Sequence, residues 1–332
     1  MRTARIGAML LAAIVVIAAC SDDEESSPST APATTQDAST STSSPESSTT
    51  VNTDAADTTD ASDATALDEP AASQYYLAIG DSYAVGYLAG IGPSTDGFVD
   101  GVVAGAADAG RPLQVINVGC SGATTASLIG TPGCEPAALA PGADPYSTTQ
   151  LDAAVAFLEA HPGEVALITV SIGGNDVIPC AITGPDLVAC VTTATTTMAA
   201  NLTTALDRIR AAAPDALVVG TTYPDVALGA WVTTFPGAKE RAAESVTAFR
   251  DVINPALLDA YTAAGGRFVD VTEATGGYGS LDDTTTLDPY GEVPTPVAQV
   301  CELTAFCSDF DIHPTPDGYD LIAGLVLAEY LG

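Results

Sequence analysis

The chain has 332 residues, of which 42 are acidic and 9 are basic, and its formal net charge is −33 at pH 7. Such an acidic surface repels nucleic acid and anionic lipid headgroups, so nucleic-acid binding is excluded as the main function. With two histidines and no Cys-x-x-Cys pair, the sequence also argues against a zinc site. We expect neither a metal nor an organic cofactor.

Residues 1–20 have the composition of an export signal. Two arginines precede an uncharged stretch, residues 6–19, which is too short to span a bilayer comfortably. The stretch ends in Ile17-Ala18-Ala19-Cys20, which resembles the lipobox of bacterial lipoproteins. That resemblance implies lipidation of Cys20; ordinary secretion with an incidental Cys20 is the alternative. We therefore expect an exported, extracytoplasmic protein that contacts the membrane only through this anchor.

Residues 21–73 differ in composition from the rest of the chain. They are rich in Ser, Thr, Ala and Asp and contain neither Lys nor Arg. Such a segment buries too little apolar surface to offset the entropy of ordering, which predicts a disordered acidic tether. The tether is either a spacer that spans the cell wall or a passive linker. Residues 74–332 then form one domain.

Apart from Cys20, six cysteines lie in this domain. An even number in an exported domain indicates disulfides rather than free thiols. Several connectivities are possible, and pairing between neighbours in sequence is the simplest. The expected disulfides are Cys120–Cys134, Cys180–Cys190 and Cys301–Cys307.

Apolar runs without polar alternation predict buried strands, and helical stretches separate them. The predicted strands cover residues 75–79, 113–118, 165–172, 216–221 and 267–271, and the predicted helices residues 149–160, 192–213, 238–264 and 316–331. This alternation predicts an α/β protein, a three-layer α/β/α sandwich of flavodoxin-like type with a central, mainly parallel five-stranded sheet. Residues 272–307 show little periodicity, and we expect them to form an ordered loop near the site.

Four short blocks carry the residues with chemical potential: Gly80-Asp81-Ser82-Tyr83, Asn117-Val118-Gly119-Cys120-Ser121-Gly122, Gly173-Gly174-Asn175-Asp176 and Asp311-Ile312-His313-Pro314. The first three each follow a predicted strand. Ligands of parallel sheets bind at the carboxyl ends of the strands, so these blocks are expected to converge on one site.

Ser82 is the candidate nucleophile. We expect it at the N-terminus of a helix, where backbone amides and the helix dipole favour an anionic intermediate. A plain N-cap role is the alternative for an isolated serine. Ser121 is a competing nucleophile, but the chain contains no Gly-x-Ser-x-Gly motif.

The second and third blocks offer oxyanion donors. The backbone N–H of Gly122 can approach a developing oxyanion closely, and the side-chain amide of Asn175 is a further donor. Ordinary turn roles are the alternatives for both, and Asp176 is expected to brace its turn.

His313 is the candidate general base, because neutral imidazole accepts a hydroxyl proton near pH 7. The other histidine, His161, precedes Pro162-Gly163 between a predicted helix and a predicted strand. We expect it to be a helix C-cap or a surface loop residue.

Together the four blocks resemble those of the SGNH/GDSL hydrolase superfamily, over the whole domain from Tyr75 onwards. The resemblance implies the SGNH-hydrolase fold, Ser82 as nucleophile and His313 as base. It also implies an oxyanion hole made by the N–H groups of Ser82 and Gly122 and the side chain of Asn175. In overall style the chain is similar to disulfide-bearing, secreted actinobacterial esterases and lipases.

Two positions depart from the family pattern. Tyr83 stands where the family usually has Leu, which we expect to have little effect. The family acid is usually an Asp three residues before the His, and that position is Phe310 here. Asp311 is the preferred candidate; Asp309, or a backbone carbonyl that supports a functional dyad, is the alternative.

The sequence therefore predicts a serine esterase or lipase that cleaves carboxylic esters through an acyl-serine intermediate and acts as a monomer. Its partner is a small-molecule, lipid or glycan ester. A carbohydrate O-deacetylase or an acyltransferase acting on envelope glycans is the alternative within enzymes. A non-catalytic binding lipoprotein is the alternative outside them.

Overall fold

A computed structural model describes residues 74–183 and 186–332. The predicted export signal at 1–20, Cys20 and the tether at 21–73 lie outside the described residues. In the described part, no helix is both long and apolar enough to cross a membrane.

The centre of the described domain is a parallel sheet of five strands in the order β2-β1-β3-β4-β5. This confirms the predicted sheet. The strands are β1 (Gln74–Gly80), β2 (Leu113–Asn117), β3 (Val165–Ser171), β4 (Leu217–Thr221) and β5 (Arg267–Val269). Each agrees with its predicted range except at the ends. The largest difference is at Val271, which was expected in the last strand and instead begins a short helix.

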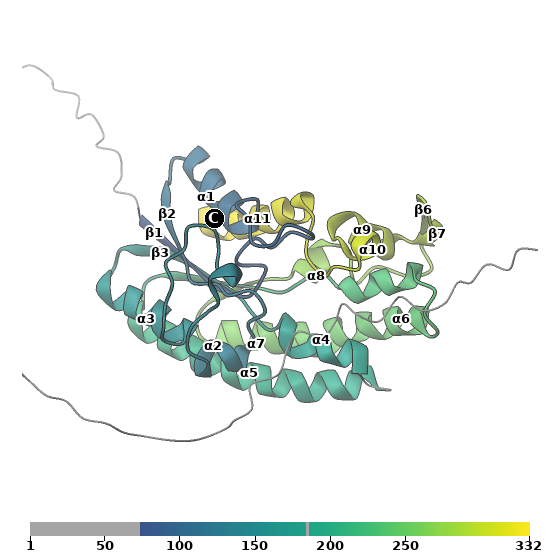
Figure 1. The fold of residues 1–332 in the computed structure, drawn as a ribbon, viewed down its shortest axis with the longest axis horizontal. Helices are drawn as coiled ribbons and strands as arrows, with labels where there is room; N and C mark the ends of the chain where they lie inside the picture. Colours follow the sequence, from purple (N-terminus) through teal and green to yellow (C-terminus); the bar gives the residue numbers. More distant parts are fainter. Residues whose placement is uncertain (1–73, 184–185) are drawn as a thin grey trace, which may run out of the picture. The chain divides into compact units, whose positions relative to one another are not determined.

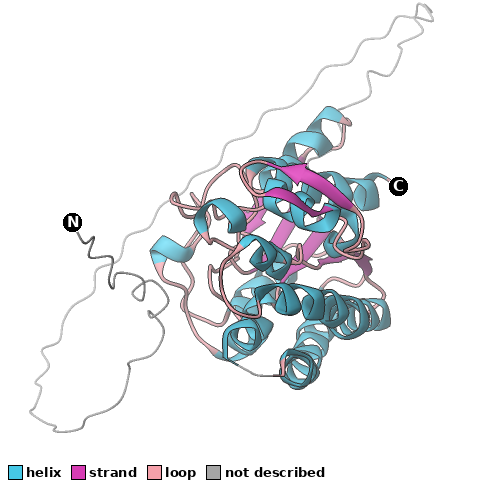
Figure 2. Cartoon of the chain, turned by 90° about the vertical axis from the view of Figure 1, so that its right-hand side faces the viewer, coloured by secondary structure: helices cyan, strands magenta, loops and turns pink. Residues whose placement is uncertain are grey.

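Helices cover both faces of the sheet, as expected for a three-layer sandwich (Figures 1 and 2). On β1, Leu77 and Ile79 pack into the core on one face, while Tyr76 and Ala78 pack into the core on the other. The first face is covered by α3 (Gln150–Ala160), α5 (Leu187–Ala212) and α7 (Asn254–Ala263), and the second by α1 (Phe98–Asp108) and α11 (Pro316–Leu331). A strand covered on both faces needs apolar residues at every position, which explains the unbroken apolar runs.

The remaining elements lie mainly towards the carboxyl ends of the strands. They are α2 (Thr125–Gly130), η1 (Pro136–Ala138), α4 (Gly174–Thr183), η2 (Val226–Val232), α6 (Ala238–Ala248), η3 (Phe249–Ile253), α8 (Val271–Ala274), β6 (Thr284–Leu287), β7 (Gly291–Pro294), α9 (Thr295–Leu303) and α10 (Phe306–Asp309). The predicted helix at 238–264 is a continuous helical segment, but its middle part, η3, is a π-helix.

The expectation of a loop at 272–307 is wrong. This stretch contains the antiparallel hairpin β6–β7, helix α9 and the start of α10. Val293, Val297 and Val300 from the stretch pack with Leu228 of η2 and Val246 of α6 in a separate apolar cluster. A small core of its own therefore orders the segment.

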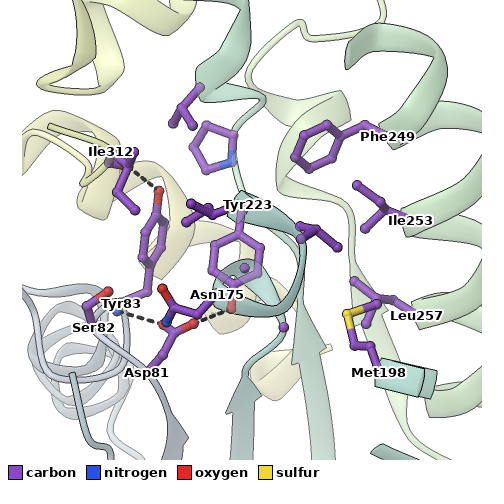
Figure 3. A pocket seen from close by; sticks show the side chains of 16 residues that line it. Asp81, Ser82, Tyr83, Asn175, Met198, Tyr223, Phe249, Ile253, Leu257 and Ile312 are labelled. Carbon is purple, nitrogen blue, oxygen red and sulfur yellow. Dashed lines mark hydrogen bonds between the residues drawn. The ribbon is translucent and has the colours of Figure 1, made fainter. Parts of the chain in front are cut away.

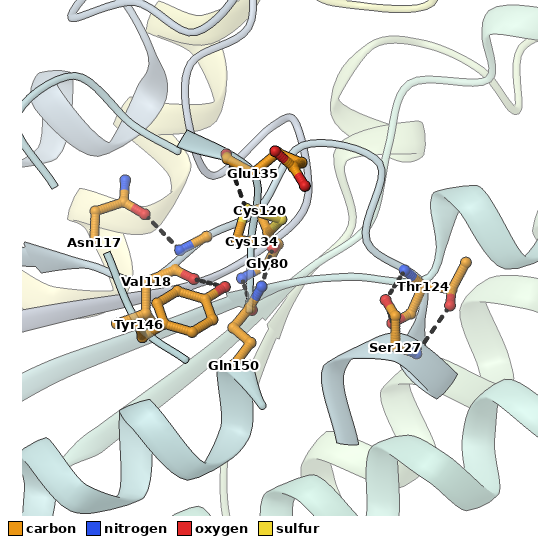
Figure 4. The surroundings of a disulfide bond; sticks show 11 residues. Gly80, Asn117, Val118, Cys120, Thr124, Ser127, Cys134, Glu135, Tyr146 and Gln150 are labelled. Atoms are coloured by element: carbon orange, nitrogen blue, oxygen red, sulfur yellow. Dashed lines mark hydrogen bonds between the residues drawn. A yellow bond between two sulfur atoms is a disulfide. The ribbon is translucent and has the colours of Figure 1, made fainter. Parts of the chain in front are cut away.

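The structure contains the three expected disulfides, Cys120–Cys134, Cys180–Cys190 and Cys301–Cys307. Cys120 immediately precedes Ser121 and Gly122 in the second block. Around this bridge, Tyr146 donates a hydrogen bond to the carbonyl of Val118, and Gln150 bonds to the backbone of Gly80 (Figure 4). The N–H of Cys120 itself donates to the carbonyl of Gly80 at 3.0 Å, so the bridge lies at a contact between the first two blocks.

Candidate active site

Ser82 lies in a turn directly after β1, with its side chain buried. The expectation of a helix N-terminus here, and with it the N-cap alternative, is wrong: residues 82–86 form a turn, and the next helix begins at Phe98. The N–H of Tyr87 closes the turn by donating to the carbonyl of Ser82, at 3.0 Å. Gly86 continues it with a φ of 64°, in the left-handed region that favours glycine.

Two side chains hold the backbone around Ser82. The amide of Gln150, the first residue of α3, accepts from the N–H of Gly80 at 2.9 Å and donates to the Gly80 carbonyl at 3.0 Å. Asp81 is fully buried; one carboxyl oxygen accepts from the N–H of Tyr83 at 3.0 Å, and the other accepts from the phenol of Tyr223 at 2.7 Å. The turn that carries Ser82 is therefore held in place by α3 and by Tyr223, just past the end of β4.

Burial governs the ionisation of the Asp81–Tyr223 pair. It raises the pKa of Asp81 to about 7, against the lowering effect of the two hydrogen bonds. Burial and the neighbouring carboxyl raise the pKa of Tyr223 well above 10, so the phenol stays protonated and donates. Tyr223 is not among the predicted site residues, although it lies two residues past the end of β4, and the carboxyl ends of parallel strands are where ligand sites form.

The second and third blocks are joined to one another. The side-chain N–H₂ of Asn175 donates to the carbonyl of Ala123 at 2.9 Å, one residue past Gly122. Asp176 accepts from the backbone N–H of Thr125 at 2.9 Å and from its hydroxyl at 2.5 Å. Asp176 therefore connects the start of α4 to the start of α2 and does more than brace its own turn.

At two of the predicted oxyanion-hole positions, the backbone N–H group has no hydrogen-bond acceptor in the described part of the chain. Among the described residues, neither the N–H of Ser82 nor that of Gly122 makes a hydrogen bond. Gly122 has a φ of 82°, and a Cβ built there would meet no atom within 4 Å. The space beside Gly122 is therefore open, and its N–H is accessible to a ligand.

His313 is paired with Asp311. The ring Nδ1 lies 2.5 Å from Oδ1 of Asp311, and the same carboxylate oxygen accepts from the His313 backbone N–H at 3.0 Å. Asp309 instead accepts from the hydroxyl of Ser308 at 2.8 Å. Of the three candidates for orienting the imidazole, Asp311 is the one that contacts it.

Two tyrosines link the segment around Ser82 to the segment that contains His313. The ring of Tyr87 lies over that of His313, with centroids 4.2 Å apart. The phenol of Tyr83 donates to the carbonyl of Ile312 at 2.8 Å. The expectation that Tyr83 has little effect is therefore incomplete, because a Leu could not make this bond. The described residues contain no hydrogen bond between Ser82 and His313, and such bonds are often long before substrate binds.

An apolar pocket opens at these blocks (Figure 3). Ser82 and Asn175 both line it, and Ile312, adjacent to His313, lies at its wall. Hydrophobic side chains make up most of the remaining lining: Val177, Ile178, Met198, Val226, Phe249, Ile253 and Leu257.

Two further expectations concern histidine and metal sites. His161 is the C-cap of α3, as expected, and its ring Nδ1 lies 2.9 Å from the carbonyl of Phe157. Across residues 74–183 and 186–332, His, Cys, Asp and Glu form no group of three that could hold a metal ion.

The fold is a parallel α/β/α sandwich, and Ser82, Gly122, Asn175 and His313 lie beyond the carboxyl ends of its strands. This combination is that of a hydrolase of the SGNH kind. The model of the GDSL-like Lipase/Acylhydrolase family matches residues 78–321, and the chain belongs to this family. Proteins of this class are hydrolases that act on esters.

The chain is also similar to several solved structures at low sequence identity. An extracellular lipase from Streptomyces rimosus is 22% identical, with 77% of this chain and 99% of that chain covered and a TM-score of 0.46. Phospholipase A1 from Streptomyces albidoflavus is 20% identical, with coverages of 78% and 98% and a TM-score of 0.44. The lipase Lip_vut3 from a goat rumen metagenome is 16% identical, with coverages of 77% and 97% and a TM-score of 0.48. The chain matches no curated protein.

Proposed function

We propose that the protein is an extracytoplasmic serine esterase that cleaves carboxylic esters through an acyl-serine intermediate. Ser82 Oγ attacks the ester carbonyl carbon while the imidazole of His313 takes the hydroxyl proton. The tetrahedral intermediate collapses, and the alcohol leaves with the proton from His313. Water, deprotonated by the same imidazole, then attacks the acyl-serine and releases the carboxylic acid.

The oxyanion of each tetrahedral intermediate is stabilised by three donors in this proposal. The N–H groups of Ser82 and Gly122 have no partner among the described residues, and Asn175 is held by its bond to Ala123 with one amide hydrogen left over. Preorganised donors need no reorientation as charge develops. Asp311 fixes the orientation of the His313 ring and stabilises the imidazolium.

One observation carries the proposal: Ser82 and Asn175 line the same apolar pocket, next to the segment that contains the Asp311–His313 pair. In this arrangement the carbonyl of an ester can lie at Ser82 and Asn175, and an apolar part of the ester can enter the pocket. The three disulfides indicate an oxidising compartment. We further propose lipid anchoring at Cys20, action as a monomer, and a small-molecule, lipid or glycan ester as substrate.

The test is ester hydrolysis by the oxidised protein and two alanine variants. Ser82→Ala is expected to reduce kcat by on the order of 10⁴-fold or more, because the nucleophile is lost. Ser121→Ala is the matched control, since Ser121 is the nearby competing serine. Equal turnover in Ser82→Ala and the wild type, or loss in Ser121→Ala alone, would contradict the proposed mechanism.

A further inference from the structure

The apolar pocket beside Ser82 is closed on the side away from the catalytic blocks. In Figure 3 the side chains of Met198 and Leu257 lie opposite Asp81 and Asn175. Met198, Ile253 and Leu257 are almost completely buried, so they form a floor rather than a rim. A group that enters next to Ser82 therefore meets a wall of hydrocarbon and thioether atoms.

Met198 of α5 fixes one part of this floor. Its thioether packs over Gly173, so that a Cβ built on that glycine would lie 2.5 Å from Sδ. Gly173 itself has a φ of 119°. The residue just before α4, the helix that begins with Gly174 and Asn175, is therefore in direct contact with Met198 in the floor of the pocket.

The π-helical segment η3 builds the rest of the floor. Phe249, Ile253 and Leu257 all line the pocket, at intervals of four residues. In a regular α-helix the third of these would be rotated by about 80° from the first, because each step of four residues overshoots one turn by about 40°. A π turn, here with the N–H of Asn254 bonded to the Phe249 carbonyl, contains more residues and offsets that rotation. The π turn therefore brings three side chains to one pocket.

The space in the pocket is small. The cavity volume is about 50 Å³. Pockets that hold drug-sized ligands have volumes of about 300–1,000 Å³. The pocket therefore fits a short acyl chain better than a long one.

We propose that this pocket binds the acyl chain of the ester and limits it to short chains. Met198 and the ridge formed by Phe249 and Ile253 of η3 and Leu257 of α7 set the limit. The inference rests on the proposed esterase function and adds its substrate class, esters of short-chain carboxylic acids. A chain of eight carbons would have to displace the floor, whereas acetyl and butyryl groups fill the existing space.

The experiment compares p-nitrophenyl acetate, butyrate and octanoate as substrates of the oxidised protein. The wild type is expected to give a lower kcat/KM on octanoate than on butyrate. Met198→Ala and Phe249→Ala enlarge the pocket from two different helical segments. Each should raise the octanoate-to-butyrate ratio of kcat/KM at least about 10-fold, since even one methylene of fit in an apolar pocket changes kcat/KM on that scale.

Leu202→Ala is the matched control. Leu202 lies one turn after Met198 on α5 and is equally buried, but it does not line the pocket. This control should lower the melting temperature without changing the octanoate-to-butyrate ratio. If Met198→Ala does not fold, Phe249→Ala still tests the inference, because Phe249 is only half-buried and its loss should destabilise the protein less.

Two results would overturn the inference: a wild type that prefers octanoate, or pocket variants whose ratios match that of Leu202→Ala. Both leave ester hydrolysis itself in place. A folded wild type that hydrolyses none of the three esters would instead reject the proposed function, and this inference with it.

Discussion

His313 is subject to two opposing influences on its protonation. Burial lowers its pKa below the ordinary value of 6.5, and the carboxylate of Asp311 acts in the opposite direction without reversing the shift. The imidazole is therefore neutral, and able to accept a proton, at pH values somewhat below 6.5. The acid limb of kcat/KM should follow this lowered pKa.

Asp311→Asn is expected to reduce kcat by roughly 10²–10⁴-fold, because the imidazole loses the group that fixes its orientation and stabilises its charged form. Without the carboxylate that raises the pKa of His313, the acid limb should also move to lower pH. The measurement is a pH profile of kcat/KM on one ester. Asp309→Asn is the control, since that carboxylate bonds to Ser308 instead, and it should leave the profile unchanged. Small effects from both single variants and the double variant would instead favour support of the imidazole by a backbone carbonyl.

The sequence predicted where the four blocks lie because strand ends and turn residues leave clear patterns. It favoured Asp311 but left Asp309 as an alternative, because the decision depends on the conformation of the backbone between them. Phe310 has a φ of 57°, the one non-glycine residue in the described part with a positive φ. This left-handed residue places the Asp311 carboxylate on the histidine, and a phenylalanine gives no sequence signal for that conformation.

At the level of elements, buried strands were predictable and several helices were not. Helix α1 contains Gly101 and Gly105, which lower intrinsic helix propensity. In the structure they face α11, where a Cβ on Gly101 would lie 2.8 Å from the Cβ of Ala323, and one on Gly105 would meet the side chain of Leu327. The glycines permit the close approach of two helices, a tertiary requirement that local patterns do not reveal.

Each disulfide joins two segments that lie close to one of the four blocks. Cys301–Cys307 connects α9 to α10, just before Phe310 and Asp311. Loss of a disulfide commonly costs about 2–4 kcal/mol. Mild reduction is therefore expected to lower both the melting temperature and the esterase activity as thiols are released. Full activity in protein whose six thiols are all shown by labelling to be free would contradict a preorganising role.

Over the whole molecule, a buried carboxyl outside the site should make stability depend on pH. Asp225 is fully buried; its Oδ2 accepts from Ser245, and its Oδ1 has no partner among the described residues. Burial raises its pKa from 3.8 to about 7. A raised carboxyl pKa gives stability that is complete below 3.8 and is lost as the pH rises through about 7.

Asp225→Asn removes this titration. Relative to that of the wild type, its free energy of unfolding should increase by about 2–4 kcal/mol between pH 4 and pH 8, because the wild type alone loses stability over this range. Denaturant unfolding at both pH values measures the difference, which cancels the contributions of groups common to both proteins. Asp259→Asn, at an exposed position on α7, is the control. A difference from the wild type that is the same at both pH values would show that Asp225 does not titrate in this range.

The proposed mechanism depends most directly on Ser82 as the nucleophile. The decisive measurement is reaction of the oxidised protein with a fluorophosphonate, followed by peptide mapping of the adduct by mass spectrometry. We predict one phosphonylated residue, Ser82, in proportion to the loss of esterase activity, and no adduct in Ser82→Ala. An adduct at another serine such as Ser121, or ester hydrolysis that persists with Ser82 fully modified, would contradict the central claim.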